Sequence, residues 1–415
     1  MKMLQKNLTK VGPLLIEKPE LARYVTPFEN KKVPIYRWYN YNHSFSRGLV
    51  LFLAKEFNLN GKDLVLDPFC GAGTTLLACK EIGVSALGID ILPLSVFVTN
   101  TKLSDFNLVN LRSTWVRFWK GFNVTQNIDV SGMTFLGKVF SDETLKKVMF
   151  SKQKILDIGE IATQNFLLLC LLSTLDKVSI ARKDGGFLRF SRLKQPLPFR
   201  EAFSLEFNLM LSDLKISPFG SKSGVWLACQ GDSRCLPFDT DSFDTVITSP
   251  PYLNRHDYTR VYAAELLTGF LKDESELKEL RYHSIRSHVE ARRVFKADGF
   301  KPPTELDEIL RHLSQTSLPN SQVVPMIRGY FEDIYLTLRE LYRVAKEGAR
   351  VNFVIGNVRY GGIMIPVDTL LAEIGNDIGF SLEKIIIARY KGNSPQQMRR
   401  FGKELSRESI IVWRK

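Results

Sequence analysis

Short apolar blocks alternate with amphipathic stretches along the chain, and this pattern predicts strands and helices in turn. The predicted strands cover 64–66, 86–89, a stretch that ends near 231, 245–248, 350–357, 383–390 and 408–415. The predicted helices cover about 74–82, 166–175, 330–349 and 367–380. This alternation indicates an α/β fold with a doubly wound, mainly parallel sheet, and the closing pair of strands indicates an antiparallel hairpin at one edge.

Two segments do not follow the alternation, and we interpret both as insertions into one core domain. Residues 101–223 have a mainly helical pattern, whereas residues 264–325 are charged and irregular. The core is therefore predicted to comprise 1–100, 224–263 and 326–415.

The composition narrows the class of protein. The 415 residues carry a net charge of +13, with a pI of about 9.4, which favours a polyanionic partner such as nucleic acid. The five cysteines form no CxxC pair, so we expect no metal site and a reducing, cytoplasmic location. The first twenty residues lack the apolar core of a signal peptide, and the run 166–175 is too short to span a bilayer, so no membrane association is expected.

A glycine-containing loop follows the first strand of the core. Gly71 and Gly73 in "DPFCGAGTT" allow a tight turn and a close approach of a ligand to the backbone. Asp90 ends the next strand, where a carboxylate can accept from both hydroxyls of a ribose, and Asp232 ends another, where it can accept from a purine amine. The loop has no phosphate-binding lysine. These features suggest an adenosine without pyrophosphate, a description that S-adenosylmethionine fits.

A second motif, Thr-Ser-Pro-Pro-Tyr, occupies 248–252. Two prolines fix the backbone and remove N–H donors, so the Ser249 and Pro250 carbonyls are free to accept hydrogen bonds beside the ring of Tyr252. Such a turn suits a planar group that carries an NH2. Taken alone, such a turn is more often purely structural.

The motifs "LDPFCGAGTT", "GID", "GDS" and "TSPPY", in this order, resemble those of the exocyclic-amino DNA methyltransferases, which use S-adenosylmethionine and have a Rossmann-like fold. The upstream segment 38–57 resembles the family segment that closes over the methionine end of the cofactor. By motif and resemblance together, the expected cofactor-binding residues are Tyr41, His43, Ser44, Phe45, Asp67, Phe69, Cys70, Gly71, Gly73, Thr74, Asp90, Ile91, Asp232, Ser233 and Ser249.

The resemblance also implies a catalytic turn made of Ser249, Pro250, Pro251 and Tyr252. The Ser249 hydroxyl and the Pro250 carbonyl would accept from the target amine, and Tyr252 would stack on a flipped-out base. Family members with serine at the first position mostly modify N4 of cytosine, so we expect a cytosine-N4-specific enzyme of a restriction-modification system. Methylation at carbon 5 would need a Pro-Cys dipeptide, which the chain lacks.

Basic stretches at 182–200 and 279–293 are candidates for contact with duplex DNA, although solvated charged loops would have the same composition. The expected DNA-contacting residues are Arg189, Arg192, Lys194, Arg255, His256, Arg260, Arg286 and Arg293. The alternatives are an adenine-N6 enzyme, an RNA base methyltransferase and an inactive nucleic-acid-binding protein. A cognate restriction endonuclease is a candidate partner.

Overall fold

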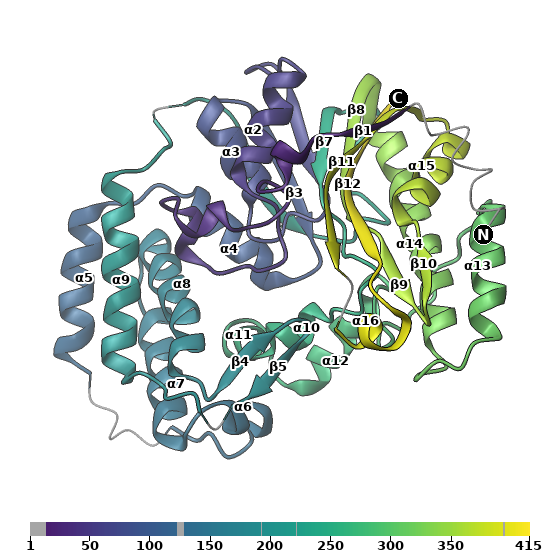
Figure 1. The fold of residues 1–415 in the computed structure, drawn as a ribbon. Coiled ribbons are helices and arrows are strands. Elements are labelled where there is room, and N and C mark those ends of the chain that lie inside the picture. The colour runs from purple at the N-terminus through teal and green to yellow at the C-terminus, as the bar shows by residue number, and fades with distance from the viewer. Residues whose placement is uncertain (1–13, 123–127, 192, 221, 393–394) are drawn as a thin grey trace.

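A computed structural model describes residues 14–122, 128–191, 193–220, 222–392 and 395–415. Its centre is an eight-stranded sheet of order β1-β11-β12-β8-β7-β2-β3-β6 (Figure 1). The strands are β1 (Leu15–Glu17), β2 (Leu64–Asp67), β3 (Ser85–Asp90), β6 (Trp226–Gln230), β7 (Phe243–Thr248), β8 (Ala345–Gly356), β11 (Ser381–Gly392) and β12 (Leu405–Arg414). Only the pairings of β12 with β8 and β11 are antiparallel. The prediction of a mainly parallel α/β sheet is confirmed.

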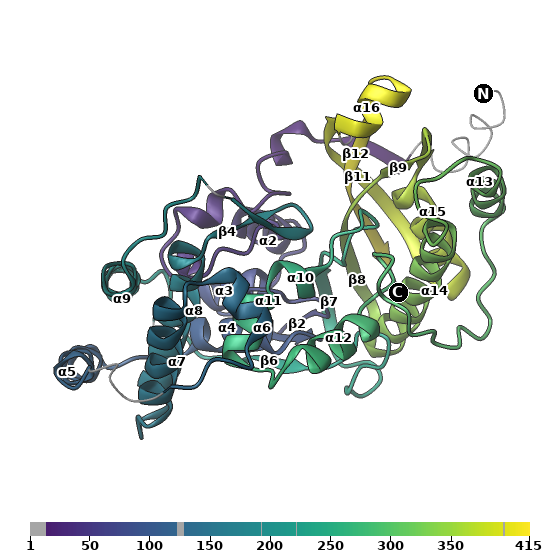
Figure 2. The same ribbon diagram turned by 90° about the horizontal axis from the view of Figure 1, so that it is seen from below.

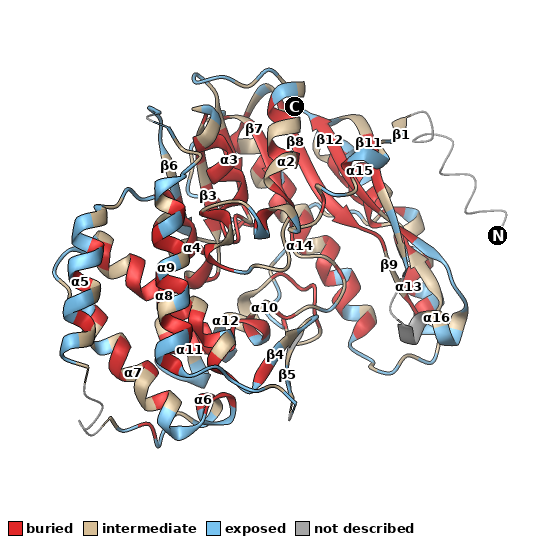
Figure 3. Cartoon of the chain, turned by 60° about the vertical axis from the view of Figure 1, so that its left-hand side comes forward, coloured by how far each residue is buried: buried red, intermediate tan, exposed pale blue. Residues whose placement is uncertain are grey.

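Helices cover both faces of the sheet, and neighbouring strand residues face opposite hydrophobic clusters. The helices are α2 (Arg47–Glu56), α3 (Thr74–Ile82), α4 (Pro93–Leu103), α14 (Val323–Val344) and α15 (Val367–Ile378), and buried residues follow both the strands and these helices (Figure 3). In β12, Ile410 belongs to the buried cluster that includes residues of α2, α3 and α4, whereas Ile411 belongs to the cluster that includes residues of α14 and α15. Burial on both faces explains the near-continuous apolar runs of the strands.

The strand order reverses between β2 and β7. From β2 the chain moves outward through β3 to β6, and then it returns to the other side of β2 as β7. In an open α/β sheet, ligands bind outside the carboxyl ends of the strands at such a reversal. Asp67, Asp90 and Thr248 end the three strands nearest this point.

The segment 101–223 is mainly helical and stands beside the sheet, as Figures 1 and 2 show. Its elements are α5 (Leu108–Lys120), α6 (Thr134–Val139), α7 (Asp142–Leu156), α8 (Ile161–Val178), the hairpin β4 (Ala181–Asp184) and β5 (Phe187–Phe190), and α9 (Phe199–Lys215). Helix α8 is longer than the apolar run predicted, and its length and composition alone would allow a membrane span. However, 61% of it is buried inside the protein, as in the core helix of a soluble domain.

The segment 264–325 is only partly irregular, which corrects the prediction. It contains most of α11 (Ala263–Gly269), α12 (Glu274–His283) and α13 (Thr304–Ser314), follows α10 (Tyr258–Val261), and has neither helix nor strand between 284 and 303. In α13 the buried residues Leu306, Ile309, Leu310 and Leu313 follow a helical period beneath a charged outer face. The high charge of this segment obscured a regular amphipathic helix.

Two further predictions need correction. The helix predicted at 330–349 ends at Val344, because the next residues extend β8 and pair with β7 from Phe243 onward. The closing hairpin does not form the very edge of the sheet, because β1 adds a parallel strand outside β11. The remaining elements are the small hairpin β9 (Val358–Tyr360) and β10 (Ile363–Ile365), α16 (Pro395–Phe401), and the 3-10 turns Pro19–Leu21, Glu29–Lys31 and Tyr36–Trp38.

Candidate functional site

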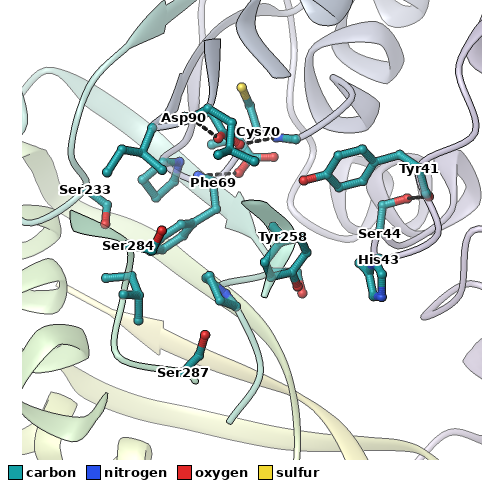
Figure 4. Close-up of a pocket in the computed structure, with 18 of the residues that line it drawn as sticks. Tyr41, His43, Ser44, Phe69, Cys70, Asp90, Ser233, Tyr258, Ser284 and Ser287 are labelled. Carbon is teal, nitrogen blue, oxygen red and sulfur yellow. Dashed lines mark hydrogen bonds between the residues drawn. The ribbon is translucent and has the colours of Figure 1, made fainter. Parts of the chain in front are cut away.

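A pocket opens at the carboxyl ends of β2, β3, β6 and β7, where the strand order reverses (Figure 4). It gathers fourteen of the fifteen residues predicted to bind a cofactor, and Gly73 is the exception. It also gathers residues that the sequence analysis did not assign to cofactor binding, namely Pro68, Leu92, Gly231, Arg234, Pro251, Tyr258, Ser284, Ile285, Ser287 and His288. Of these, only Pro251 was predicted for the site in another role.

The glycine loop crosses the pocket floor in a conformation that favours glycine. Gly71 has φ +52° and Gly73 has φ +84°. A Cβ on Gly73 would lie 2.8 Å from Thr99, and one on Gly71 would lie 3.2 Å from the ring of Tyr41. Gly73 therefore lets the loop pack on α4 behind the pocket, while Gly71 lets Tyr41 lie against the loop.

Asp90 holds the loop in place and keeps acceptor capacity for a ligand. Its two oxygens accept from the backbone N–H groups of Gly71 and Leu92, both at 2.9 Å. Each carboxylate oxygen has a second lone pair. Burial raises the pKa of Asp90 to about 6, while the two backbone hydrogen bonds act in the opposite direction.

Asp67 differs from Asp90 because its carboxylate oxygens accept three hydrogen bonds from other groups of the protein. It accepts from the hydroxyls of Thr75 and Thr248, both at 2.6 Å, and from the N–H of Phe69 at 3.1 Å. Burial raises its pKa to about 6 as well. Asp67 thus ties the start of α3 to the end of β7, which indicates that it shapes the pocket rather than reading a ligand.

The segment before α2 forms one wall of the pocket and contributes Tyr41, His43, Ser44 and Phe45. The ring of Tyr41 stacks on that of Tyr262, with 4.9 Å between centroids. Burial lowers the pKa of His43 to about 4, so this wall is uncharged at neutral pH.

Asp232 lines the pocket with both oxygens already engaged. They accept from the guanidinium of Arg234, at 2.9 Å from Nε and 2.7 Å from Nη2. Arg234 also forms an ion pair with Asp333, with 3.1 Å between Nη1 and Oδ2. If Asp232 accepts from a purine amine as predicted, it must do so with oxygens that also accept from Arg234.

The Ser-Pro-Pro-Tyr turn follows β7, and β8 supports it. The Ser249 hydroxyl donates to the carbonyl of Val354 at 3.1 Å. The ring of Tyr252 packs against Gly356, where a Cβ would lie 3.1 Å from the ring, and Lys391 Nζ lies 5.3 Å from the ring centroid. Ser249 and Pro251 line the pocket, whereas Pro250 and Tyr252 lie outside its lining.

Three residues predicted to contact DNA are engaged within the protein. Arg286 is 7% exposed and binds Asp333 and Glu332, which contradicts its predicted role. The side chain of Lys194 is 12% exposed; its ammonium donates to the Ala181 carbonyl and pairs with Asp176 at 3.3 Å, which also contradicts a DNA contact. His256 is half-buried and packs against His43, with 4.9 Å between centroids.

The other basic residues predicted to contact DNA differ in whether they pair with acidic side chains of the protein. Arg260 pairs with Asp257 at 3.3 Å and Glu290 at 3.6 Å, Arg189 contacts Asp184 at 3.5 Å, and Arg293 contacts the ring of His283. Arg255 is exposed, has φ +66° and has no acidic partner among the described residues. Arg192 lies outside the described residues.

The lining fits a nucleoside that carries a positive charge. Arg234 is the one lysine or arginine in the described lining, and its charge is balanced by Asp232 and Asp333. Asp67 and Asp90 add carboxylates nearby, so the pocket offers no grip for a phosphate and suits a sulfonium cation. No group of three or more potential metal-binding side chains occurs within the part of the chain that the structure describes.

Comparison with known proteins points in the same direction. A family model described as DNA methylase matches residues 28–95. The chain is 32% identical over 438 residues to the Type II methyltransferase M.AvaI of Nostoc sp., covering 95% of this chain and 89% of that protein. It is also 32% identical over 442 residues to the Type II methyltransferase M.BsoBI of Geobacillus stearothermophilus, covering 93% of this chain and 86% of that protein.

Proposed function

The chain belongs to the exocyclic-amino DNA methyltransferases, and from this membership we propose that it methylates the N4 amino group of cytosine in duplex DNA. We further propose that it is the modification enzyme of a type II restriction-modification system in the cytoplasm. The similarity to two Type II methyltransferases along most of the chain supports the second proposal.

The N4 assignment rests on serine as the first residue of the turn, and the hydrogen bond of Ser249 is compatible with a role as acceptor. A hydroxyl has one proton and two lone pairs, and the proton of Ser249 is used by the Val354 carbonyl at 3.1 Å. Its lone pairs therefore remain to accept from an incoming amine. Family members with aspartate or asparagine at this position of the turn mostly modify N6 of adenine, whereas those with serine, as here, mostly modify N4 of cytosine.

The residues of the turn prepare the amine for attack. An amine conjugated to a ring is a weak nucleophile, because its lone pair is delocalised. The Ser249 hydroxyl and the Pro250 carbonyl draw its two N–H groups out of the ring plane, so that the lone pair becomes available. The nitrogen then gains the methyl group and loses one proton to water. No covalent intermediate with the protein is required.

Pocket residues would hold S-adenosylmethionine, which supplies a methyl carbon on a sulfonium sulfur that leaves with both bonding electrons. Asp90 would accept from the ribose hydroxyls, and the glycine loop would allow a close approach of the ligand to the backbone. Tyr252 would stack on the extruded base. Such stacking contributes about 1–3 kcal/mol per base, against a few kcal/mol for extrusion.

Nucleoside mass spectrometry tests this proposal. The protein is incubated with S-adenosylmethionine and unmethylated duplex DNA, and the digest is searched for N4-methyldeoxycytidine. Ser249→Ala should reduce the product strongly, whereas Ser223→Ala, at an exposed position before β6, should not. N6-methyldeoxyadenosine would instead overturn the cytosine assignment and keep the methyltransferase. A product in RNA alone would overturn the DNA substrate, and the absence of any product would favour a binding protein.

A further inference from the structure

The segment Ser284–His288 belongs to the insertion 264–325, yet it forms a wall of the pocket. Ser284, Ile285, Ser287 and His288 line the cavity opposite the wall that contains Tyr41 and Ser44 (Figure 4). The Ser287 carbonyl also accepts from the N–H of Arg255 at 3.1 Å, in the loop that follows the catalytic turn. The position of this segment therefore affects both the cofactor pocket and the catalytic loop.

Arg286, in the middle of this segment, is directed away from the pocket into helix α14. Its guanidinium donates to Asp333 Oδ1 at 2.7 Å from Nη2 and to Glu332 Oε2 at 3.0 Å from Nη1. Its backbone N–H donates to Asp333 Oδ2 at 2.9 Å. Both the main chain and the side chain of Arg286 are thus fastened to one carboxylate.

The same carboxylate fastens a second wall. Asp333 is fully buried and pairs with Arg234, whose guanidinium holds Asp232 on the pocket lining. Arg234 also donates to the carbonyl of His283, at the end of α12. One buried carboxylate therefore joins the strand-end loop after β6 to the insertion segment.

Helix α14 makes room for this arrangement. Gly329 lies within the helix, where glycine lowers helix stability by about 1 kcal/mol relative to alanine. A Cβ at Gly329 would lie 2.6 Å from Arg286 Cδ and 2.7 Å from Nη1. Gly329 therefore lowers the stability of the helix, but it allows Arg286 to approach Asp333.

We propose that Arg286 and Arg234, joined at Asp333, are positioning residues that hold two walls of the cofactor pocket in register. This inference rests on the proposed function. A buried ion pair contributes little net stability compared with apolar packing, so a role in placing the pocket walls accounts better for this cluster. It also replaces the expected DNA contact of Arg286 with a role in cofactor binding.

Gly329→Ala is the sharpest test, because it displaces Arg286 without removing a charged group and introduces a residue that favours helix. Binding of S-adenosylhomocysteine to the full chain, measured by calorimetry without DNA, should weaken at least tenfold. The KM for S-adenosylmethionine should rise more than kcat falls, and DNA affinity without cofactor should stay within twofold. Gly137→Ala, in helix α6 with nothing within 4 Å of the added Cβ, is the matched control and should bind as the wild type does.

Arg286→Met and Arg286→Lys provide a second measurement. The methionine variant should lose cofactor affinity, and the lysine variant should recover part of it by restoring the charge. Unchanged cofactor affinity in both Gly329→Ala and Arg286→Met would overturn the inference, as would a loss confined to DNA affinity. Failure of the wild-type protein to bind S-adenosylhomocysteine would instead overturn the proposed function.

Discussion

The cofactor pocket and the surface around the catalytic turn both collect polar side chains at the ends of the strands, but they hold these side chains differently. In the pocket, the Asp90 and Asp67 carboxylates accept from defined groups of the glycine loop and neighbouring elements. Around the turn, Arg260 and Arg189 pair with nearby carboxylates, whereas Arg255 and Arg293 are exposed and have no acidic partner among the described residues. The hydrogen bonds of the pocket are therefore already formed without a ligand, whereas we expect DNA binding to depend on a few unpaired cations and on cations that leave their carboxylate partners.

The strongest test of a preformed pocket is Asp90→Ala. The substitution removes the proposed acceptor for the ribose hydroxyls and the observed acceptor for two backbone N–H groups of the site. Hydrogen bonds to charged groups contribute about 1.5–3 kcal/mol each, so the Kd for S-adenosylhomocysteine should rise by on the order of 100-fold or more. Calorimetry measures this, with the fully exposed Asp105→Ala as a control. A Kd within threefold of the wild-type value would contradict our assignment of Asp90.

Tyr252→Ala tests the second region of the comparison, the Ser-Pro-Pro-Tyr turn. The loss of a stacking surface worth about 1–3 kcal/mol should lower kcat by about 10- to 100-fold while cofactor affinity stays within twofold, because Tyr252 lies outside the pocket lining. Single-turnover methylation of a duplex substrate measures the rate. Tyr390→Ala, at an exposed tyrosine of β11, should be close to wild type. If the substitution weakened cofactor binding more than it lowered the methylation rate, Tyr252 would belong to the cofactor site and our assignment of Tyr252 to the target base would be wrong.

Cofactor affinity should depend on pH because burial raises the pKa of Asp90 to about 6. A protonated carboxyl has lost part of its acceptor capacity, so the Kd should rise by up to about tenfold per pH unit below 6 and level off above it. Asp90→Asn should bind weakly with a flatter profile between pH 5 and 8. An unchanged pH profile in this variant would assign the titration to another group.

As the pH rises from about 4 to 6, cofactor affinity should increase, whereas the unfolding free energy of the cofactor-free protein should decrease. The pKa values of Asp67 and Asp90 are both raised above 3.8 in the folded state, so the folded state binds protons more tightly than the unfolded chain. Each group should lower the unfolding free energy by about 3 kcal/mol as the pH rises from about 4 to 6. Urea unfolding at several pH values measures this, and Asp67→Asn should remove part of the slope.

The smallest expected effect is on DNA affinity, and it should differ between a basic residue without an acidic partner, Arg255, and one that is bound within the protein, Lys194. Arg255→Ala should weaken duplex binding by about three- to tenfold at low salt and reduce the salt dependence by about one counterion. Lys194→Ala should leave DNA affinity within twofold, because its ammonium is bound to Asp176 and a carbonyl of the chain. Fluorescence anisotropy at several salt concentrations measures both. Equal losses in the two variants would show that Lys194 leaves its partners when DNA binds.

The location of the pocket was predictable from the sequence, because local patterns determine it. A strand followed by Gly71 and Gly73, and a second strand that ends in Asp90, must place these residues at one sheet edge once the strands run parallel. The pattern also predicted the turn at Ser249, since two prolines restrict the backbone whatever surrounds them.

Tertiary structure alone decided which charges are free. Nothing in the local sequence distinguishes Arg286, whose partner Asp333 is 47 residues away, from Arg255, which remains exposed. Nor could it show that Ser284–His288, in a charged insertion, lines the cofactor pocket. The succession of strands, turns and helices follows from short-range pattern, whereas the pairing of charges depends on which distant segments the fold brings within 3 Å of each other.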